Sequence, residues 1–249
     1  MTSDDLRARR AGSFGAHAHA YAEHRPDYPA AAVRWALAPL GAGRHEVLDL
    51  GAGTGKLAGG ILAEGHRVTA VEPDEAMLSE LVRRHGGVRA LPGTAERIPL
   101  PAATVDAVLV GQAFHWFDPD RALAEIARVL RPGGVLAALW NDWDEDVDWV
   151  ARFPRHTEGL PAGTTPTEDV PEHELFHDGA QRRFRHVLRR TADTLVAMLG
   201  THSKLLVSPP EVRQAYEERV RAFLAAEPAT ASGEFDVPHV SDVWRLVRR

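Results

Sequence analysis

The chain has 249 residues, of which 44% are hydrophobic and 26% charged, a composition that suits one large α/β domain with a substantial core. The net charge of −6 disfavours a general nucleic-acid binder, and no apolar run is long enough to cross a membrane. The absence of cysteine excludes disulfides, thiolate metal sites and cysteine nucleophiles, and the polar first ten residues lack the apolar stretch of a signal peptide. We therefore expect a cytoplasmic protein that binds neither nucleic acid nor membrane.

Residues 1–45 precede the first predicted strand, and we expect them to form an amino-terminal lid of cap helices. Pro26 and Pro29 interrupt this segment, and residues 30–40 have the apolar spacing of a helix. Residues 14–29 mix aromatic residues with histidines and show no single period.

Three interpretations of that mixed stretch remain open. His17 and His19 are residues of a metal-binding type, but no third ligand lies nearby, and we predict no metal site. The stretch is otherwise a solvated helical turn, or a lid that folds over a cofactor with Tyr21 and Arg25 facing inward.

A regular alternation of strands and helices begins at residue 46. The predicted strands are 46–50, 67–71, 88–91, 105–111 and 135–140, and the predicted helices between them are 56–64, 74–84 and 121–130. Such alternation implies βαβ units with right-handed crossovers, hence a doubly wound parallel sheet with helices on both faces. Ligands of such sheets bind outside the carboxyl ends of the strands. We expect residues 46–140 to form the cofactor-binding core.

The first predicted strand ends in a glycine-rich turn, with Gly51, Gly53 and Gly55 at a spacing of two. Glycine lets backbone N–H groups at a helix N-terminus approach a ligand closely. A dinucleotide-binding turn would have its third glycine where Lys56 stands. Asp49 would add negative charge beside a pyrophosphate, whereas a carboxylate there suits a cofactor that carries an ammonium group. Glu72 can grip ribose hydroxyls in either case, so the pattern favours S-adenosylmethionine over NAD.

Several motifs carry a resemblance to a known family. They are Val47–Gly55, Gly93–Glu96 with Ile98–Leu100, Gln112–Asp118, Val129–Gly134, and the amino-terminal Tyr21, Arg25–Pro26 and Tyr28–Pro29. The first resembles motif I of the class I S-adenosylmethionine-dependent methyltransferases. The whole set is similar to the type 11 methyltransferase-domain group, which includes trans-aconitate methyltransferase-like proteins. The resemblance implies a Rossmann-like, seven-stranded sheet that is mostly parallel, with an antiparallel strand near the carboxyl-terminal edge.

The same resemblance implies a role for individual residues. The cofactor-binding residues would be Tyr21, Arg25, Asp49, Gly51, Ala52, Gly53, Glu72, Pro73, Ala95, Glu96 and Gln112. Asp49 and the glycine turn would face the methionine part, Glu72 the ribose and Pro73 the adenine. Ala95 and Glu96 would border the adenine amine, with Glu96 replacing the aspartate that many relatives carry at Thr94. Gln112 would lie near the sulfur, and Tyr21 and Arg25 would close over the cofactor.

The acceptor and the catalytic groups are less determined. In-line methyl transfer gains much of its rate from alignment, and a carboxylate acceptor needs no base. A hydroxyl acceptor would benefit from a base, for which His115 is the candidate; the alternative is that His115 only caps the preceding strand. We expect residues 141–182 to form an acceptor-pocket insertion. Trp116, Trp140, Trp143 and Trp149, with Phe153 and Phe176, would line the pocket or simply form its core.

Two further stretches complete the prediction. The acidic residues Asp142, Asp144, Glu145 and Asp146 would bind a cation or form a solvated loop, of which the loop is favoured. Residues 183–249 would complete the sheet, with predicted strands at 182–188 and 237–247 and predicted helices at 191–199 and 210–224. The family resemblance also implies that His202 and Ser203 reach the pocket.

The sequence therefore predicts an S-adenosylmethionine-dependent methyltransferase that methylates an oxygen of a small molecule, as a monomer or homodimer. The alternatives are a non-catalytic S-adenosylmethionine-binding module, an NAD-dependent oxidoreductase, and a nucleic-acid methyltransferase. The acidic 142–148 stretch disfavours the last of these.

Overall fold

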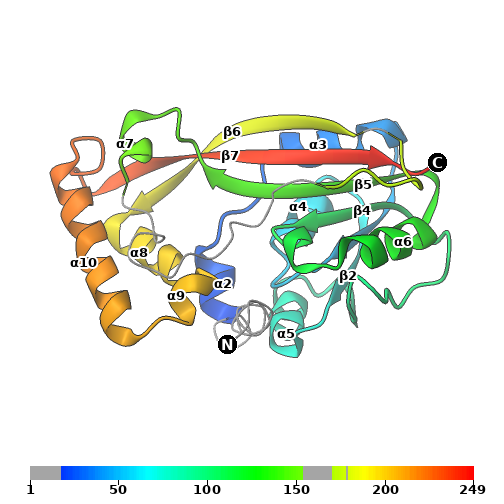
Figure 1. The fold of residues 1–249 in the computed structure, drawn as a ribbon, viewed down its shortest axis with the longest axis horizontal. Coiled ribbons are helices and arrows are strands. Elements are labelled where there is room, and N and C mark those ends of the chain that lie inside the picture. Colours follow the sequence, from blue (N-terminus) through cyan, green and yellow to red (C-terminus); the bar gives the residue numbers. More distant parts are fainter. Residues whose placement is uncertain (1–17, 154–169, 178) are drawn as a thin grey trace. The chain divides into compact units, whose positions relative to one another are not determined.

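The computed structural model describes residues 18–153, 170–177 and 179–249 (Figure 1). Its helices and strands are, in chain order, α2 (Ala18–His24), α3 (Ala30–Leu37), η2 (Ala38–Leu40), β1 (Glu46–Leu50), α4 (Lys56–Ala63), β2 (Arg67–Glu72), α5 (Glu75–Arg84), β3 (Arg89–Pro92), β4 (Val105–Gly111), η3 (Phe114–Trp116), α6 (Pro119–Val129), β5 (Leu130–Trp143), α7 (Asp148–Ala151), β6 (Ala180–Thr191), α8 (Ala192–Gly200), α9 (Ser203–Leu206), α10 (Pro210–Ala226) and β7 (Glu234–Val247). Among these residues, no helix is both long enough and apolar enough to cross a membrane.

The strands form one seven-stranded sheet in the order β3-β2-β1-β4-β5-β7-β6. The neighbours from β3 to β5 pair in parallel. Strand β7 runs against β5, because Arg248 N–H donates to Gly134 O at 2.8 Å while Gly133 N–H donates to Arg248 O at 3.2 Å. The arrowheads in Figure 1 show the same reversal. This arrangement confirms the predicted fold class, with the antiparallel strand next to the carboxyl-terminal edge.

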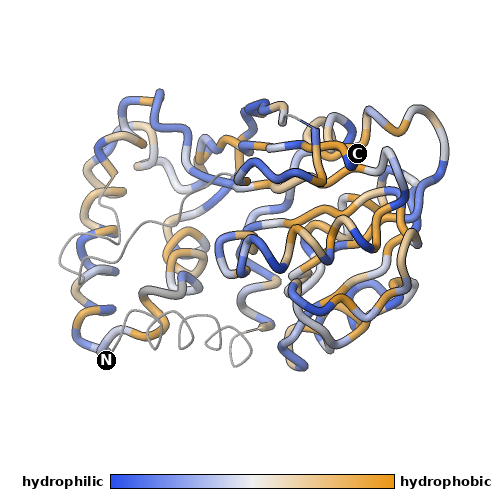
Figure 2. The backbone as a smooth tube through the Cα atoms, turned by 45° about the vertical axis from the view of Figure 1, so that its right-hand side comes forward, coloured by the Kyte–Doolittle hydropathy of each residue, from blue (hydrophilic) through white to orange (hydrophobic). Residues whose placement is uncertain are grey.

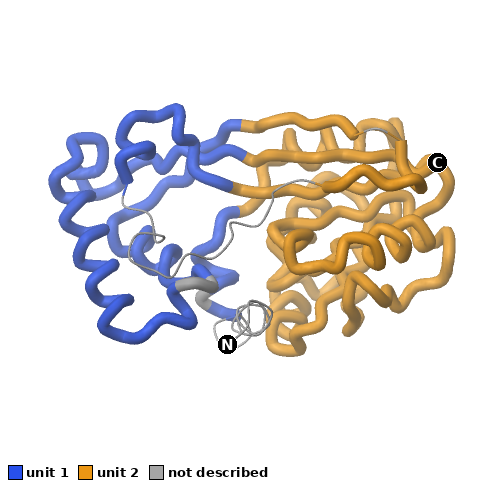
Figure 3. Tube along the Cα trace, viewed as in Figure 1, with its two compact units in different colours: residues 1–26, 142–165, 185–240 blue, residues 27–141, 166–184, 241–249 orange. Residues whose placement is uncertain are grey.

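The chain divides into two compact units, coloured in Figure 3. Unit 2 comprises residues 27–141, 166–184 and 241–249, and contains most of the sheet. Alternate residues of its strands point to opposite faces, so Val108 and Val110 of β4 join a core with α6 while Leu109 joins a core with α3 and α4. Burial on both faces explains why β4 is an almost continuous apolar run.

Unit 1 comprises residues 1–26, 142–165 and 185–240, as far as these are described. Its core is built from α7, α8, α10 and the first part of β7, and includes Trp149, Leu195, Tyr216 and Phe235. Helix α10, the long helix on the left of Figure 2, alternates hydrophilic and hydrophobic segments, as expected for a helix with one buried face.

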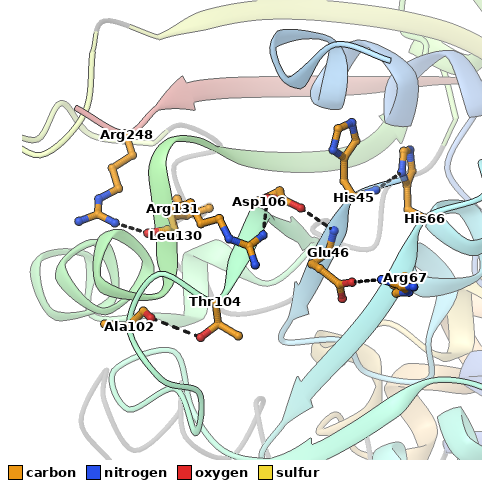
Figure 4. A network of polar contacts seen from close by, with 10 residues as sticks. All are labelled: His45, Glu46, His66, Arg67, Ala102, Thr104, Asp106, Leu130, Arg131 and Arg248. Carbon is orange, nitrogen blue, oxygen red and sulfur yellow. Dashed lines mark hydrogen bonds and ion pairs between the residues drawn. The ribbon is translucent and has the colours of Figure 1, made fainter. Parts of the chain in front are cut away.

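A polar network joins the amino ends of the strands in unit 2 (Figure 4). Asp106 at the start of β4 accepts a hydrogen bond from Glu46 N–H of β1 at 2.8 Å and pairs with Arg131 of β5. Glu46 in turn pairs with Arg67 of β2 at 2.6 Å. These contacts fix the register of four neighbouring strands at the end of the sheet opposite to the glycine turn.

The local sequence predicted most of the helix and strand boundaries. It predicted the long strands to be shorter than they are. Asp74, Asp118 and Thr191 cap α5, α6 and α8 through their side chains, as expected from their positions. The fifth strand, expected at 135–140, extends over Leu130–Trp143 because its two ends pair with β7. It therefore includes Pro132 and Gly133, which lie between the predicted helix 121–130 and the predicted strand 135–140.

Replacing Leu109 by alanine tests the two-sided core. Its side chain is fully buried in the central strand β4, so Leu109→Ala should lower the free energy of unfolding by about 2–5 kcal/mol in urea denaturation. Leu175, whose side chain is 38% exposed, is the matched control, and Leu175→Ala should stay within about 0.5 kcal/mol of the wild type. Equal losses in the two variants would contradict the assignment of the core.

Candidate active site

The glycine turn adopts the left-handed backbone that its composition predicts. Gly51, Gly53 and Gly55 have φ angles of +70°, +53° and +85°, a region that L side chains rarely occupy. The N–H groups of Gly51 and Ala52 donate to Val71 O at 2.9 and 3.1 Å, which joins the turn to the end of β2. The turn then enters α4 at Lys56.

Gly51 and Gly53 differ in what an added side chain would meet. A Cβ atom on Gly51 would lie 2.7 Å from the Cβ of Ala113, so the protein itself excludes a side chain there. A Cβ atom on Gly53 would meet no protein atom within 4 Å. The space beside Gly53 is therefore open to a ligand that approaches the backbone.

Glu72, at the end of β2, fastens the turn to the next helix. Its Oε2 accepts from Gly53 N–H at 2.9 Å and its Oε1 accepts from Asp74 N–H at 3.0 Å. Burial raises the pKa of this carboxyl, while the two N–H groups oppose the shift by favouring the charged form. Each oxygen keeps a further lone pair, so the carboxylate can still accept hydrogen bonds from two ribose hydroxyls.

Asp49 is the most unusual group in the site. The residue is 1% exposed, and neither carboxylate oxygen makes a hydrogen bond of ordinary geometry with the described residues. Burial raises its pKa to about 7; the nearby N–H of Ala58 favours the charged form, and the charge of Glu72 raises the pKa further. An orphaned carboxyl two residues before the glycine turn fits a cofactor that carries an ammonium group and is ill suited to a pyrophosphate.

Gln112 follows β4 with a strained backbone. Its φ angle is +53°, which is uncommon for a residue other than glycine and typical of functional sites. The conformation is held by Gln112 N–H, which donates to Leu139 O at 2.9 Å, and by its side-chain Nε2, which donates to Asn141 O at 2.6 Å. Asn141 also accepts from Ser241 and donates to Asp27 O at 3.2 Å. Sequence reasoning selected Gln112 and missed this supporting chain.

The predicted adenine-side residues lie on the loops after β2 and β3. Ala95 is buried in the core, and Pro73 is exposed at the start of the turn into α5. Glu96 Oε1 accepts from Asp118 N–H at 3.0 Å, next to the N-terminus of α6. This contact gives Glu96 a structural role, and its contact with an adenine stays a prediction.

Tyr21 and Arg25 belong to unit 1. The guanidinium of Arg25 lies 5.1 Å from the centre of the Tyr21 ring, and donates to Thr201 Oγ1 at 2.9 Å and Thr201 O at 3.2 Å. These bonds tie α2 to the end of α8. The predicted closure of this pair over the cofactor stays a prediction.

The predicted acceptor-side residues are distributed over both units. His115 and Trp116 lie in η3, just after β4, with their rings 4.8 Å apart. Trp140 and Phe176 are both buried in the core of unit 2, with exposed fractions of 1% and 2%. In unit 1, Trp143 stacks on Phe153 at 4.6 Å. Their contacts with an acceptor stay predictions.

The acidic stretch after β5 is partly neutralised by a residue that the sequence did not single out. Arg185 of β6 pairs with Asp144 at 2.9 Å and also with Asp146. Within the described ranges, no group of three or more His, Cys, Asp or Glu residues is arranged to hold a metal ion. His19 is exposed on α2. His17 lies outside the described ranges, and the side chain of Ser203 is not described either.

Comparison with known proteins agrees with this site. Residues 48–138 match the family model of a methyltransferase domain. An uncharacterized methyltransferase of Mycobacterium tuberculosis is 42% identical over 231 residues, which cover 92% of this chain and 93% of the relative. A malonyl-[acyl-carrier protein] O-methyltransferase of Pectobacterium atrosepticum is 39% identical over 103 residues, which cover 41% of this chain and 40% of the relative. A solved structure from Anaeromyxobacter dehalogenans, provisionally described as a type II methyltransferase, has 29% identity and a TM-score of 0.65 over 90% of this chain and 97% of its own.

The sheet order, the glycine turn and these matches define a class I, Rossmann-like methyltransferase that uses S-adenosylmethionine. The chain belongs to the methyltransferase family of its Mycobacterium tuberculosis relative. The alternative of an NAD-dependent oxidoreductase is therefore wrong. The Lys56 side chain, at the position where a dinucleotide-binding turn needs glycine, instead pairs with Asp27 at 3.1 Å.

The raised pKa of Asp49 makes stability depend on pH. Between its unfolded value of 3.8 and its folded value of about 7, the folded state keeps a proton that the unfolded state has released. Stability therefore falls as pH rises through that window, by on the order of 4 kcal/mol. Asp49→Asn removes this dependence, so the variant should gain stability over the wild type in urea denaturation between about pH 5 and about pH 8.

Asp106→Asn is the control with the opposite sign. Although burial opposes the shift, Glu46 N–H and Arg131 lower the pKa of Asp106. Its stabilising contribution is lost only as pH falls below about 4, so its difference from the wild type should stay constant from about pH 5 to about pH 8. An Asp49→Asn difference that is equally constant would contradict the raised pKa.

Proposed function

We propose that this methyltransferase transfers the methyl group to an oxygen atom of a small molecule, either a carboxylate or a hydroxyl. Bound S-adenosylmethionine supplies a methyl group that is already activated on a sulfonium. The task of the protein is then to hold the donor, align the acceptor and exclude water. A monomer or homodimer without a nucleic-acid or membrane partner is part of the same proposal.

The observations that carry the donor side are the open space at Gly53 and the two buried carboxyls of Asp49 and Glu72. Asp49 would face the ammonium group of the methionine part, and Glu72 would accept from the ribose hydroxyls. The choice of oxygen is supported by the malonyl-[acyl-carrier protein] O-methyltransferases among the relatives, which match two-fifths of this chain.

The acceptor side would lie after β4, where Gln112 and η3 follow the strand. A carboxylate acceptor is ionised at neutral pH and needs no base. A hydroxyl acceptor needs to lose its proton, and His115 is the titratable side chain in η3 that is suited to take it. The two chemistries therefore differ in whether His115 affects the rate.

Alanine at Gly53 tests the donor site. Its added Cβ meets no protein atom, so the substitution should act on the ligand, weakening S-adenosylhomocysteine binding by about 1–3 kcal/mol in isothermal titration. Gly65 is the matched control, because its φ angle of +87° imposes the same backbone strain and its Cβ position is equally open. Gly65→Ala should lose similar thermal stability and keep wild-type affinity. Equal affinity of the two variants would overturn the placement of the cofactor.

Transfer of a radiolabelled methyl group from S-adenosylmethionine tests the acceptor. Paired carboxylates and alcohols of the same carbon skeleton are offered, and alkali then separates methyl esters, which release labelled methanol, from ethers, which do not. We expect label on oxygen. With an alcohol, His115→Asn should lower kcat by about 10²–10⁴-fold and remove the pH inflection; with a carboxylate it should have little effect. Label on nitrogen or carbon, or none despite normal cofactor binding, would overturn the proposal.

A further inference from the structure

A cavity of about 580 Å³ lies in unit 2, away from the glycine turn. It is lined by residues of the segment 170–177, by Trp244 and Leu246 of β7, and by Arg249. Because β7 is antiparallel, its end lies at the amino ends of the parallel strands, where Arg248 N–H bonds to Gly134 O at the start of β5. The glycine turn and Gln112 follow the carboxyl ends of those strands. The cavity is therefore separate from the methyl-transfer site.

Backbone bonds hold the wall of this cavity in place. His177 N–H donates to Val247 O at 2.9 Å, and Arg249 N–H donates to Leu175 O at 3.0 Å. The Arg249 side chain adds a bond from Nε to Phe176 O at 2.8 Å. The segment thus extends the edge of the sheet along β7, and the cavity is already formed without a ligand.

The floor of the cavity is apolar and continuous with the core of the unit. Phe176 and Leu246 are only 2% and 4% exposed, and Trp244 packs on the same cluster. The indole Nε1 of Trp244 is buried and has no hydrogen-bond partner among the described residues. Because that nitrogen is buried, Trp244 offers the cavity the apolar surface of its ring.

The rim of the cavity carries more negative than positive charge. Glu172 and Glu174 both line it, and neither makes an ion pair or hydrogen bond with the part of the chain that the structure describes. The one guanidinium in the lining, that of Arg249, is held by Phe176 O. His173 accepts from Leu175 N–H through Nδ1 at 3.3 Å, so this ring nitrogen is engaged within the segment.

We propose that this cavity is a second ligand site, for a small amphipathic amine. Its apolar or aromatic body would pack on Phe176, Leu246 and the Trp244 ring. Its ammonium group would pair with Glu172 and Glu174. A volume of this size is typical of small-molecule sites.

Three compounds that share the same aromatic body distinguish the effect of a ligand's charge on binding from the effect of its shape. Tyramine carries an ammonium group, tyrosol a neutral hydroxyl and 4-hydroxyphenylpropionate a carboxylate. Each is titrated into the full chain saturated with S-adenosylhomocysteine, and the indole ¹⁵N–¹H resonance of Trp244, assigned with Trp244→Phe, is followed. We expect a saturable shift with tyramine and at least about tenfold weaker binding of the other two.

Variants of the rim test the same site. The double variant Glu172→Gln with Glu174→Gln should weaken tyramine binding at least about tenfold and leave tyrosol and S-adenosylhomocysteine unchanged. Glu211→Gln with Glu218→Gln on α10 is the control for the loss of two carboxylates, and should have no effect. Equal affinity for the three compounds, no saturable shift of the Trp244 resonance, or tyramine binding that survives the double variant would each overturn the proposal.

Discussion

The cofactor site depends on one carboxylate, that of Glu72. It accepts from the N–H groups of Gly53 and Asp74, and so joins the glycine turn after β1 to the start of α5 after β2. Charge-assisted bonds of this kind are stronger than bonds between neutral groups, and burial shields them from water. The left-handed turn, with its unfavourable backbone for any residue except glycine, is thereby held in one position before a ligand arrives.

A second carboxyl, that of Asp49, lies two residues before the glycine turn. Glu72 is already satisfied by two N–H groups, whereas buried Asp49 makes no hydrogen bond of ordinary geometry with the described residues and has a pKa of about 7. A cationic ligand would stabilise the ionised form of Asp49, and a pyrophosphate would be repelled by both groups. A glycine turn of this kind occurs in both dinucleotide and S-adenosylmethionine sites. The carboxyl that precedes the turn is what distinguishes the two kinds of site.

The parts of this structure that sequence predicted are those governed by neighbours in the chain. The apolar run of β4 predicted a strand buried on both faces, and Asp74, Asp118 and Thr191 predicted helix N-caps, because these preferences act over three or four residues. The full length of β5 was not predictable in this way. Its ends depend on pairing with β7, about a hundred residues later, and that pairing overrides the turn tendency of its proline and glycines.

The loop after β4 shows the same limit at a single residue. Gln112 was identified by resemblance, but nothing in its local sequence requires a left-handed backbone, which is unfavourable for glutamine. The conformation is maintained by Leu139 O and Asn141 O of β5, and the Asn141 side chain is held by Ser241 of β7. The glycine turn is built from residues within one βαβ unit, while the loop after β4 depends on strands distant in sequence. Substitutions in β5 and β7 can therefore reposition the loop after β4 without altering the glycine turn.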